Sequence, residues 1–145
     1  MSNKQEPLSL SVLDELHTSG AGYDILRYIS LPDILGSEAD TLLYFMGKNL
    51  ARKFEIKSLG DIVHFFDKCG WGKLDLFKEK RNKLIFHMLS DSVVQRINAP
   101  IDVNFRLEAG FLAEAIRILK GKDCECVEET NKKIRQVEFE IVFIE

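Results

Sequence analysis

The sequence predicts an α+β domain, with several helices packed on one face of a four-stranded antiparallel sheet. Residues 73–89 and 122–144 each have the pattern of two strands joined by a polar turn, and such hairpins pair antiparallel. Between the two hairpins lies a long segment, residues 105–120, whose apolar positions recur every three to four residues, the period of a helix face. Because the apolar face of a helix must be buried, we expect the helices to cover the sheet.

The segment 105–120 is the longest predicted helix, and Gly121 follows it at the place where a left-handed cap commonly ends a helix. Its apolar stripe consists of Phe105, Ala109, Leu112, Ala115, Ile116 and Leu119. Gly110 and the alanines beside it form a patch of small residues. Such a patch either lets another backbone approach closely or leaves room for a ligand, and we favour close packing.

Three further helices are expected before the first hairpin. Residues 23–35 have helical spacing that Pro32 interrupts, because proline lacks a donor N–H. Residues 41–54 form a second helix with Gly47 in its middle, and residues 58–69 form a third. The buried stripe of the second helix is expected to be Leu42 or Leu43, Met46, Leu50 and Phe54.

The 145 residues fit one α+β domain, residues 21–145, preceded by an N-terminal arm, residues 1–20. The arm is polar with a short apolar patch, and we expect it to be partly flexible. It either forms one loose helix or packs on a partner.

Composition narrows the classes of function. The formal net charge of −3, with acids and bases interleaved, argues against a nucleic-acid partner, since phosphate binding needs a basic excess. No window approaches ~18 apolar residues, so no transmembrane segment is expected, and the first residues lack the apolar core of a signal peptide. Three cysteines do not make a disulfide framework. We therefore expect a cytoplasmic protein.

Cys124 and Cys126 form the most distinctive local motif. Residues two apart in a strand face the same side, so the two thiols are expected to lie together. They could supply half of a tetrahedral zinc site, but nothing in the sequence places two further ligands beside them. We therefore expect no metal, and we interpret both cysteines as small apolar side chains lining the core.

No catalytic constellation is recognisable. The three histidines, which lack motif partners, are His17, His64 and His87. Glu108 lies close to the apolar stripe of its helix, where it could be an acid within a pocket, but a position at the rim is favoured. Glu114 and Arg117 stand three apart on the same helix and are expected to form an exposed pair.

Two stretches carry a resemblance to a known family: residues 23–54, and the helix 107–120 with its Glu-Ala-Gly-Phe run at 108–111. Together they resemble the YslB-type bacterial family over nearly the whole chain after residue 20. More distantly, the order of helices, hairpin, helix with Ala-Gly-Phe, and hairpin with cysteine resembles the 4-vinyl-reductase-type small-molecule-binding domains. That superfamily includes TRAPP subunits, which hold an acyl chain, and haem-based nitric-oxide sensors.

The resemblance implies an α+β fold with a pocket or channel between the helices and the sheet. The haem sensors carry a Tyr-x-Ser-x-Arg motif that this sequence lacks, so haem is not expected. A bound acyl chain or another apolar ligand fits the resemblance better. The cysteines match only loosely the Gly-Asp-x-x-Cys ending of related domains, so no ligand role is carried over to them.

The leading prediction is a non-enzymatic cytoplasmic domain of a hydrophobic small-molecule-binding fold that forms a homodimer. The candidate ligand-pocket residues are Met46, Gly47, Leu50, Glu108, Ala109, Gly110, Phe111 and Leu112. The alternative is a homodimeric protein–protein interaction module with a closed core and no ligand. An enzyme would need Glu108, a histidine and an arginine grouped in one cleft.

Overall fold

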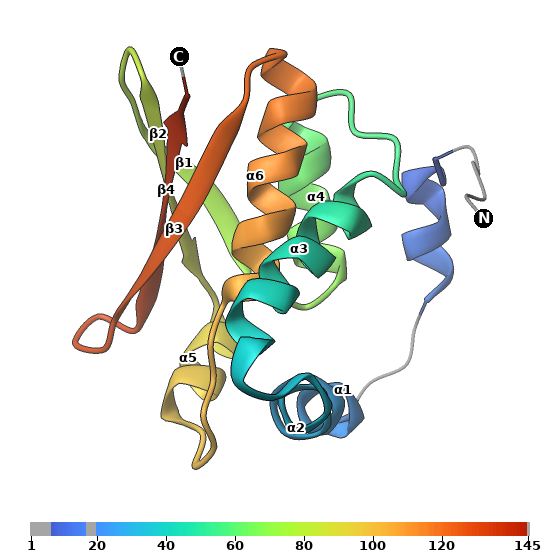
Figure 1. Cartoon of the computed structure of the whole chain (residues 1–145), viewed down its shortest axis with the longest axis vertical. Helices are drawn as coiled ribbons and strands as arrows, with labels where there is room; N and C mark the ends of the chain where they lie inside the picture. The colour runs from blue at the N-terminus through green and yellow to red at the C-terminus, as the bar shows by residue number, and fades with distance from the viewer. Residues whose placement is uncertain (1–6, 17–19, 145) are drawn as a thin grey trace.

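A computed structural model describes residues 7–16 and 20–144, which form a four-stranded antiparallel sheet with helices on one face (Figure 1). The strands are β1 (Lys73–Glu79), β2 (Lys83–Leu89), β3 (Cys124–Asn131) and β4 (Gln136–Phe143). The α-helices are α1 (Gly22–Ile25), α2 (Leu31–Leu35), α3 (Ala39–Ala51), α4 (Leu59–Lys68), α5 (Asp91–Asn98) and α6 (Arg106–Lys120). The 3₁₀ helices are η1 (Leu10–Glu15) and η3 (Gly36–Glu38), and η2 (Leu26–Ser30) is a π-helix. The predicted fold class is confirmed.

The two hairpins join through their second strands, which gives the spatial order β1-β2-β4-β3. Every second residue of β2 and β4 is buried: Leu84, Phe86, Met88, Val137, Phe139 and Ile141. The opposite face is mostly polar apart from Ile85, and there His87 lies 3.1 Å from Glu138 and Lys83 lies 3.4 Å from Glu140. This alternation explains why only one face of the sheet is covered by helices.

Helix α6 lies between the sheet and α3 (Figure 1). Residues 107–116 are all buried, because the sheet covers one side of α6 and α3 covers another. Gly121 ends the helix with a φ of 68°, the left-handed cap that the sequence indicates.

Two glycines set how closely α3 and α6 approach. A Cβ atom on Gly110 would collide with the carbonyl oxygen of Tyr44, and one on Gly47 would collide with that of Leu107 and stand 2.6 Å from the nitrogen of Phe111. Backbone therefore lies directly on backbone, and the small-residue patch forms a tight helix–helix contact. We call this contact the glycine seam.

The seam also corrects the predicted buried face of α3. The buried residues of this helix are Leu43, Tyr44, Gly47 and Ala51. Leu43, one of the two alternatives for the first position of the predicted stripe, is buried, and Leu50 and Phe54 pack against the core. Met46 is 38% exposed, so its predicted inward position was wrong. Gly47 meets the backbone of α6 directly, because only a residue without a Cβ atom permits this approach.

Pro32 was predicted to interrupt the helix of residues 23–35, and this prediction was wrong. The helix continues from α1 through η2 into α2, with Pro32 in the first turn of α2. The Leu31 N–H donates to the carbonyl of Leu26, the i−5 spacing of a π-turn. The wider turn accommodates the proline ring, which would otherwise clash with the preceding turn.

The N-terminal arm is described only in part, because residues 1–6 and 17–19 lie outside the described residues. Leu8 forms a parallel bridge with Phe54, and Leu13 in η1 is buried. The described part of the arm thus packs on the domain as a 3₁₀ helix.

Candidate functional site

A buried ion pair joins η2 to the start of α6. Arg27 is 1% exposed and Glu108 is fully buried, and Arg27 Nη2 lies 3.3 Å from Glu108 Oε1. The predicted rim position of Glu108 was therefore wrong. Its carboxylate is enclosed because η2 closes over the first turn of α6 and supplies an arginine 81 residues away in sequence.

Asn104 fixes the position of the guanidinium. Arg27 Nη2 donates to the backbone carbonyl of Asn104 at 3.2 Å and to its side-chain oxygen at 3.1 Å. The same side-chain oxygen accepts a hydrogen bond from the backbone N–H of Arg106 at 3.1 Å. One amide side chain thus holds the first turn of α6 and the buried arginine together.

The π-turn decides which residues of this helix face inward. Across residues 22–35, the buried positions are Arg27 and Tyr28, both in η2. The Arg27 guanidinium carbon lies 4.7 Å from the centroid of the Tyr28 ring. Single π-turns are rare and occur frequently at functional sites. The buried contacts of this helix with the domain are therefore made by one charged and one phenolic side chain.

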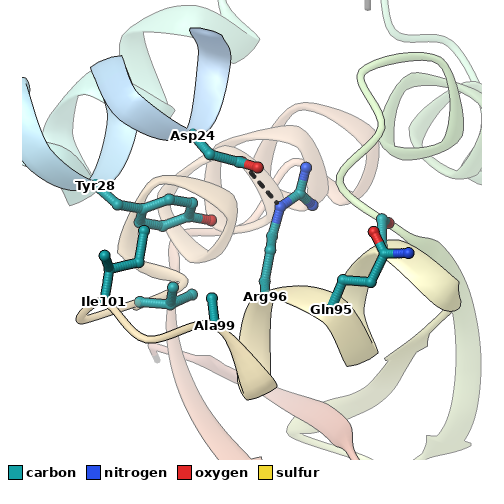
Figure 2. Close-up of a pocket in the computed structure, with 8 residues that line it drawn as sticks. Asp24, Tyr28, Gln95, Arg96, Ala99 and Ile101 are labelled. Carbon is teal, nitrogen blue, oxygen red and sulfur yellow. Dashed lines mark hydrogen bonds and ion pairs between the residues drawn. The ribbon is translucent and has the colours of Figure 1, made fainter. Parts of the chain in front are cut away.

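A small pocket of about 90 Å³ lies beside this pair, between α1, η2 and α5 (Figure 2). Its lining residues are Asp24, Tyr28, Ser92, Gln95, Arg96, Ala99, Ile101 and Val103. Figure 2 shows Arg96 rising from α5 toward Asp24, with a distance of 3.4 Å between Arg96 Nε and the Asp24 carboxylate. Arg96 also donates to the carbonyls of Gly70 and Trp71, at 2.7 and 3.1 Å. Its position is therefore fixed by α1 and by the connection between α4 and β1.

Four buried side-chain atoms around the ion pair lack a hydrogen-bond partner: Arg27 Nε, Arg27 Nη1, Tyr28 Oη and Glu108 Oε2. Buried polar atoms are nearly always paired, since leaving one unpaired costs about 1–3 kcal/mol. Their gathering around one ion pair marks this place as the strongest candidate site among the described residues. We call Arg27, Tyr28 and Glu108 the buried triad.

Burial shifts the protonation of the groups around the triad toward their neutral forms. It raises the pKa of Glu108 above its usual value, although the positive charge of Arg27 opposes the shift. Burial and the nearby Glu108 charge also raise the pKa of Tyr28, and they raise the pKa of Tyr23 to about 12. For the same reasons the pKa of Cys69 rises to about 12. The two phenols and the Cys69 thiol are therefore neutral near pH 7.

The candidate pocket residues from the sequence divide into four groups. Gly47, Ala109 and Gly110 are buried at or beside the glycine seam. Met46 is exposed on α3, and Leu50 is half-buried and packs against the core. Phe111 and Leu112 belong to the hydrophobic core, as does the ring of Phe65 that stacks on Phe111 at 4.2 Å. Glu108 alone belongs to the buried triad. Their role as a ligand pocket stays a prediction.

Cys124 and Cys126 face the same side of β3 and are both buried. Cys124 Sγ donates to the carbonyl of Ala113 at 3.2 Å, and the Cys126 N–H donates to the hydroxyl of Tyr44 at 2.9 Å. Within residues 7–16 and 20–144, no three His, Cys, Asp or Glu side chains converge as a metal site requires. The two thiols pack against α6 and α3.

We expect both of these thiols to react slowly in the folded protein. Burial raises the pKa of Cys124 to about 11 and that of Cys126 still further, so little reactive thiolate is present at pH 8. In native protein, Ellman's reagent should modify Cys124 and Cys126 at least about a hundredfold more slowly than in urea. Mass spectrometry of the modified peptides checks this, and fast native labelling at either position would contradict it.

The described histidines lie apart from the buried triad. His64 Nε2 is 3.6 Å from Asp14, and His87 is paired with Glu138 on the outer face of the sheet. His17 lies outside the described residues. The structure thus brings Glu108 next to an arginine, but it places neither His64 nor His87 in the group that an enzyme would need.

Comparison with known proteins gives the family. Residues 20–142 match the family described as "Protein of unknown function (DUF2507)". The chain belongs to this family. It is 33% identical to the uncharacterized protein YslB of Bacillus subtilis over 129 residues, which cover 89% of this chain and 87% of YslB. It is 27% identical to the uncharacterized protein MJ1642 of Methanocaldococcus jannaschii over 107 residues, covering 73% of this chain and 65% of that one.

The DUF2507 chain also has the fold of two solved proteins. A vinyl-4-reductase family protein from M. jannaschii superposes with a TM-score of 0.62 at 13% identity, covering 93% of this chain and 88% of that one. An H-NOX protein from K. algicida, solved in its unliganded Fe(II) form, gives 0.53 at 11% identity, with coverages of 94% and 88%. The predicted family is confirmed, and the fold is that of these two proteins. Among the described helices, none is both long enough and apolar enough to cross a membrane.

Proposed function

We propose that this protein is a non-enzymatic cytoplasmic interaction module that forms a homodimer through its N-terminal helices. The observation that supports this is a series of large apolar side chains exposed on α1, η2, α2 and α3. They are Ile25, Leu26, Ile29, Ile34, Leu42, Phe45 and Met46, with exposures between 38% and 80%. We call them the apolar helix surface.

The exposed side chains of the apolar helix surface are regularly spaced, unlike the single exposed apolar residues scattered over most proteins. Leu42, Phe45 and Met46 follow the i, i+3, i+4 spacing of one helix face, opposite the face of α3 that packs on α6. Ile34 is 80% exposed. Apolar faces of this kind, left uncovered in one copy of a protein, mark surfaces that another protein covers.

The remaining features fit an interaction module. The glycine seam closes the interface between α3 and α6, where the leading sequence hypothesis placed a ligand. Cys69, Cys124 and Cys126 are unpaired, as expected for a protein of a reducing compartment. The buried triad encloses its carboxylate, so Glu108 has no open cleft in which to act on a large substrate.

Light scattering coupled to size-exclusion chromatography tests the dimer. The wild-type protein is expected to elute at twice the chain mass of 16.6 kDa. Replacing Phe45 and Ile29 by glutamate should weaken self-association at least about a hundredfold, because two charges would be buried in the interface. Ile134→Glu is the matched control, since Ile134 is 59% exposed in the β3–β4 turn. A wild-type monomer at all concentrations, or a dimer that survives both glutamates, would refute the proposal.

A second candidate function is the binding of a hydrophobic small molecule, which the likeness to a vinyl-4-reductase family fold favours. The supporting observation is a pocket of about 150 Å³ between the start of α4, the sheet and the end of α6. Its lining residues are Leu59, Leu76, Glu79, Leu84, Phe86, Ile116, Leu119 and Lys120. It is smaller than the ~300 Å³ at which drug-sized pockets begin, so it suits a short apolar group. Native mass spectrometry followed by solvent extraction tests it, and protein that carries no adduct counts against it.

A further inference from the structure

We propose that the buried triad is a binding site for a small carboxylate, entered from the pocket between α1, η2 and α5. The ligand is a monocarboxylate of one to three carbons, such as formate, acetate or propionate. It would accept hydrogen bonds from Arg27 and Tyr28 and share a proton with Glu108. This site is separate from the apolar helix surface, so it does not depend on the homodimer.

The donors of the site are already present and unused. Arg27 Nε and Nη1 and the Tyr28 hydroxyl have no partner, while Arg27 Nη2 is held by Asn104 and Glu108. Hydrogen bonds from guanidinium to carboxylate are among the strongest that proteins make. The Nε–H and Nη1–H groups lie on different edges of the guanidinium, so one carboxylate accepts from one of them and from the Tyr28 hydroxyl, which relieves two of the four unpaired atoms.

The fourth unpaired atom, Glu108 Oε2, explains how an anion can enter beside a carboxylate. When the ligand binds, Glu108 takes up one proton from solvent, and its new O–H donates to a ligand oxygen. The charge then balances, with +1 on Arg27, −1 on the ligand and none on Glu108. Burial already raises the pKa of Glu108, so this proton is taken up more readily than by an ordinary glutamate.

The charged and titratable groups around Glu108 favour this exchange. They come from every element packed against it: Arg27 and Tyr28 of η2, Tyr23 of α1, Cys69 after α4, and Arg96 of α5. The phenols and the thiol are neutral near pH 7, because burial raises the pKa of Tyr23 and Cys69 to about 12 and raises that of Tyr28 as well. Both arginines are cations, and the Asp24 carboxylate is paired with Arg96. A protonated Glu108 therefore leaves a net positive charge for the ligand.

The size of the pocket limits the ligand. Its volume of about 90 Å³ equals the share of roughly three waters in the liquid, at ~30 Å³ each. Formate and acetate fit this space, whereas an aromatic acid does not. Tyr28 lines the pocket, and its ring centroid lies 4.7 Å from the Arg27 guanidinium carbon, so this ring separates the pocket from the triad and has to move for a ligand to reach Arg27.

Calorimetry and amide NMR of the full chain test the site with sodium formate and sodium acetate, at pH 5.5 and 7.5 and constant ionic strength. Binding is expected to be about a hundredfold tighter at pH 5.5 than at pH 7.5, because one proton is taken up with the anion and each pH unit then changes the affinity about tenfold. Repeating the titration in buffers of different ionisation enthalpy should give an uptake close to one proton. The amide shifts should centre on η2 and the first turn of α6.

Three variants separate ligand binding from a merely structural role. Tyr28→Phe removes only the hydroxyl and should weaken acetate binding at least fivefold. Glu108→Gln should retain binding but lose its pH dependence and its proton uptake. Arg81→Met removes an exposed arginine from the β1–β2 turn and should change nothing.

Three results would overturn the proposal. The first is that chloride or inorganic phosphate gives the same shifts at the same concentration, which means an adventitious ion only. The second is that Tyr28→Phe binds acetate as tightly as the wild type. The third is the absence of any saturable binding by folded wild-type protein at pH 5.5.

Discussion

Replacing Gly110 by alanine is expected to lower the free energy of unfolding by about 3 kcal/mol or more, and to leave part of the protein unfolded. The added Cβ atom would overlap the carbonyl oxygen of Tyr44 and crowd its carbonyl carbon and Cα. These are backbone atoms of a buried helix, so no side chain can rotate away to make room. The overlap can be removed only if α3 moves away from α6, which would open the largest helix–helix contact of the domain.

Urea denaturation followed by circular dichroism measures this effect, and Gly60→Ala is the matched control. Gly60 also lies within a helix, α4, but a Cβ atom there meets only the Ser58 hydroxyl, at 3.6 Å. That substitution should be neutral or stabilise the protein by about 0.5 kcal/mol, because alanine favours helix. Gly47→Ala should resemble Gly110→Ala, since it meets the Leu107 carbonyl. If both seam variants were as stable as Gly60→Ala, the close contact would be refuted.

The features that the sequence predicted well are those encoded locally. The alternation in β4 and the apolar period of α6 each depend on residues a few positions apart, and both predicted elements formed. Ser58 caps α4 by accepting from the backbone N–H of Asp61, which is again a local signal. From such elements the layer arrangement follows, because two hairpins and a set of apolar helices can bury their faces in few ways.

The features that the sequence missed depend on partners far along the chain. Glu114 was predicted to form an exposed pair with Arg117, but it is 2% exposed and also accepts a 2.7 Å hydrogen bond from Arg52, which follows α3. Burial tends to raise the pKa of Glu114, but hydrogen bonds from the two arginines outweigh this effect and lower it. The α6 sequence alone cannot predict the contact with Arg52, because Arg52 lies 62 residues before Glu114.

Arg27 was overlooked for a different reason. It lies within an apolar run, between Leu26 and Tyr28, where helical spacing alone cannot tell which side faces the core. The structure turns Leu26 and Ile29 outward, at 56% and 50% exposure, and buries the arginine. Arg27 lies inside an apolar run, and Glu108 lies close to the apolar stripe of its helix. These two positions together are the signal that could have suggested a buried ion pair.

The second large effect is expected at this pair. Arg27→Met should lower the free energy of unfolding by roughly 3–5 kcal/mol at pH 7, because it leaves Glu108 buried without its counter-charge. Adding Glu108→Leu to Arg27→Met should recover most of this loss, since the unpaired charge is then gone. Denaturant titrations of the wild type, the two single variants and the double variant form a cycle that isolates the coupling.

The pH dependence of this cycle separates the charge effect from lost packing. The pKa of Glu108 in the folded protein lies above its usual value of 4.5, so the folded state holds the proton more tightly than the unfolded state. The stability that this carboxyl contributes is therefore greatest at low pH and falls as the pH rises through the folded pKa. Without Arg27 the pKa rises further, so the deficit of Arg27→Met should shrink when the pH is lowered from 7 to 5. A deficit that stays constant over this range would mean that lost packing, and not an unpaired carboxylate, destabilises the variant.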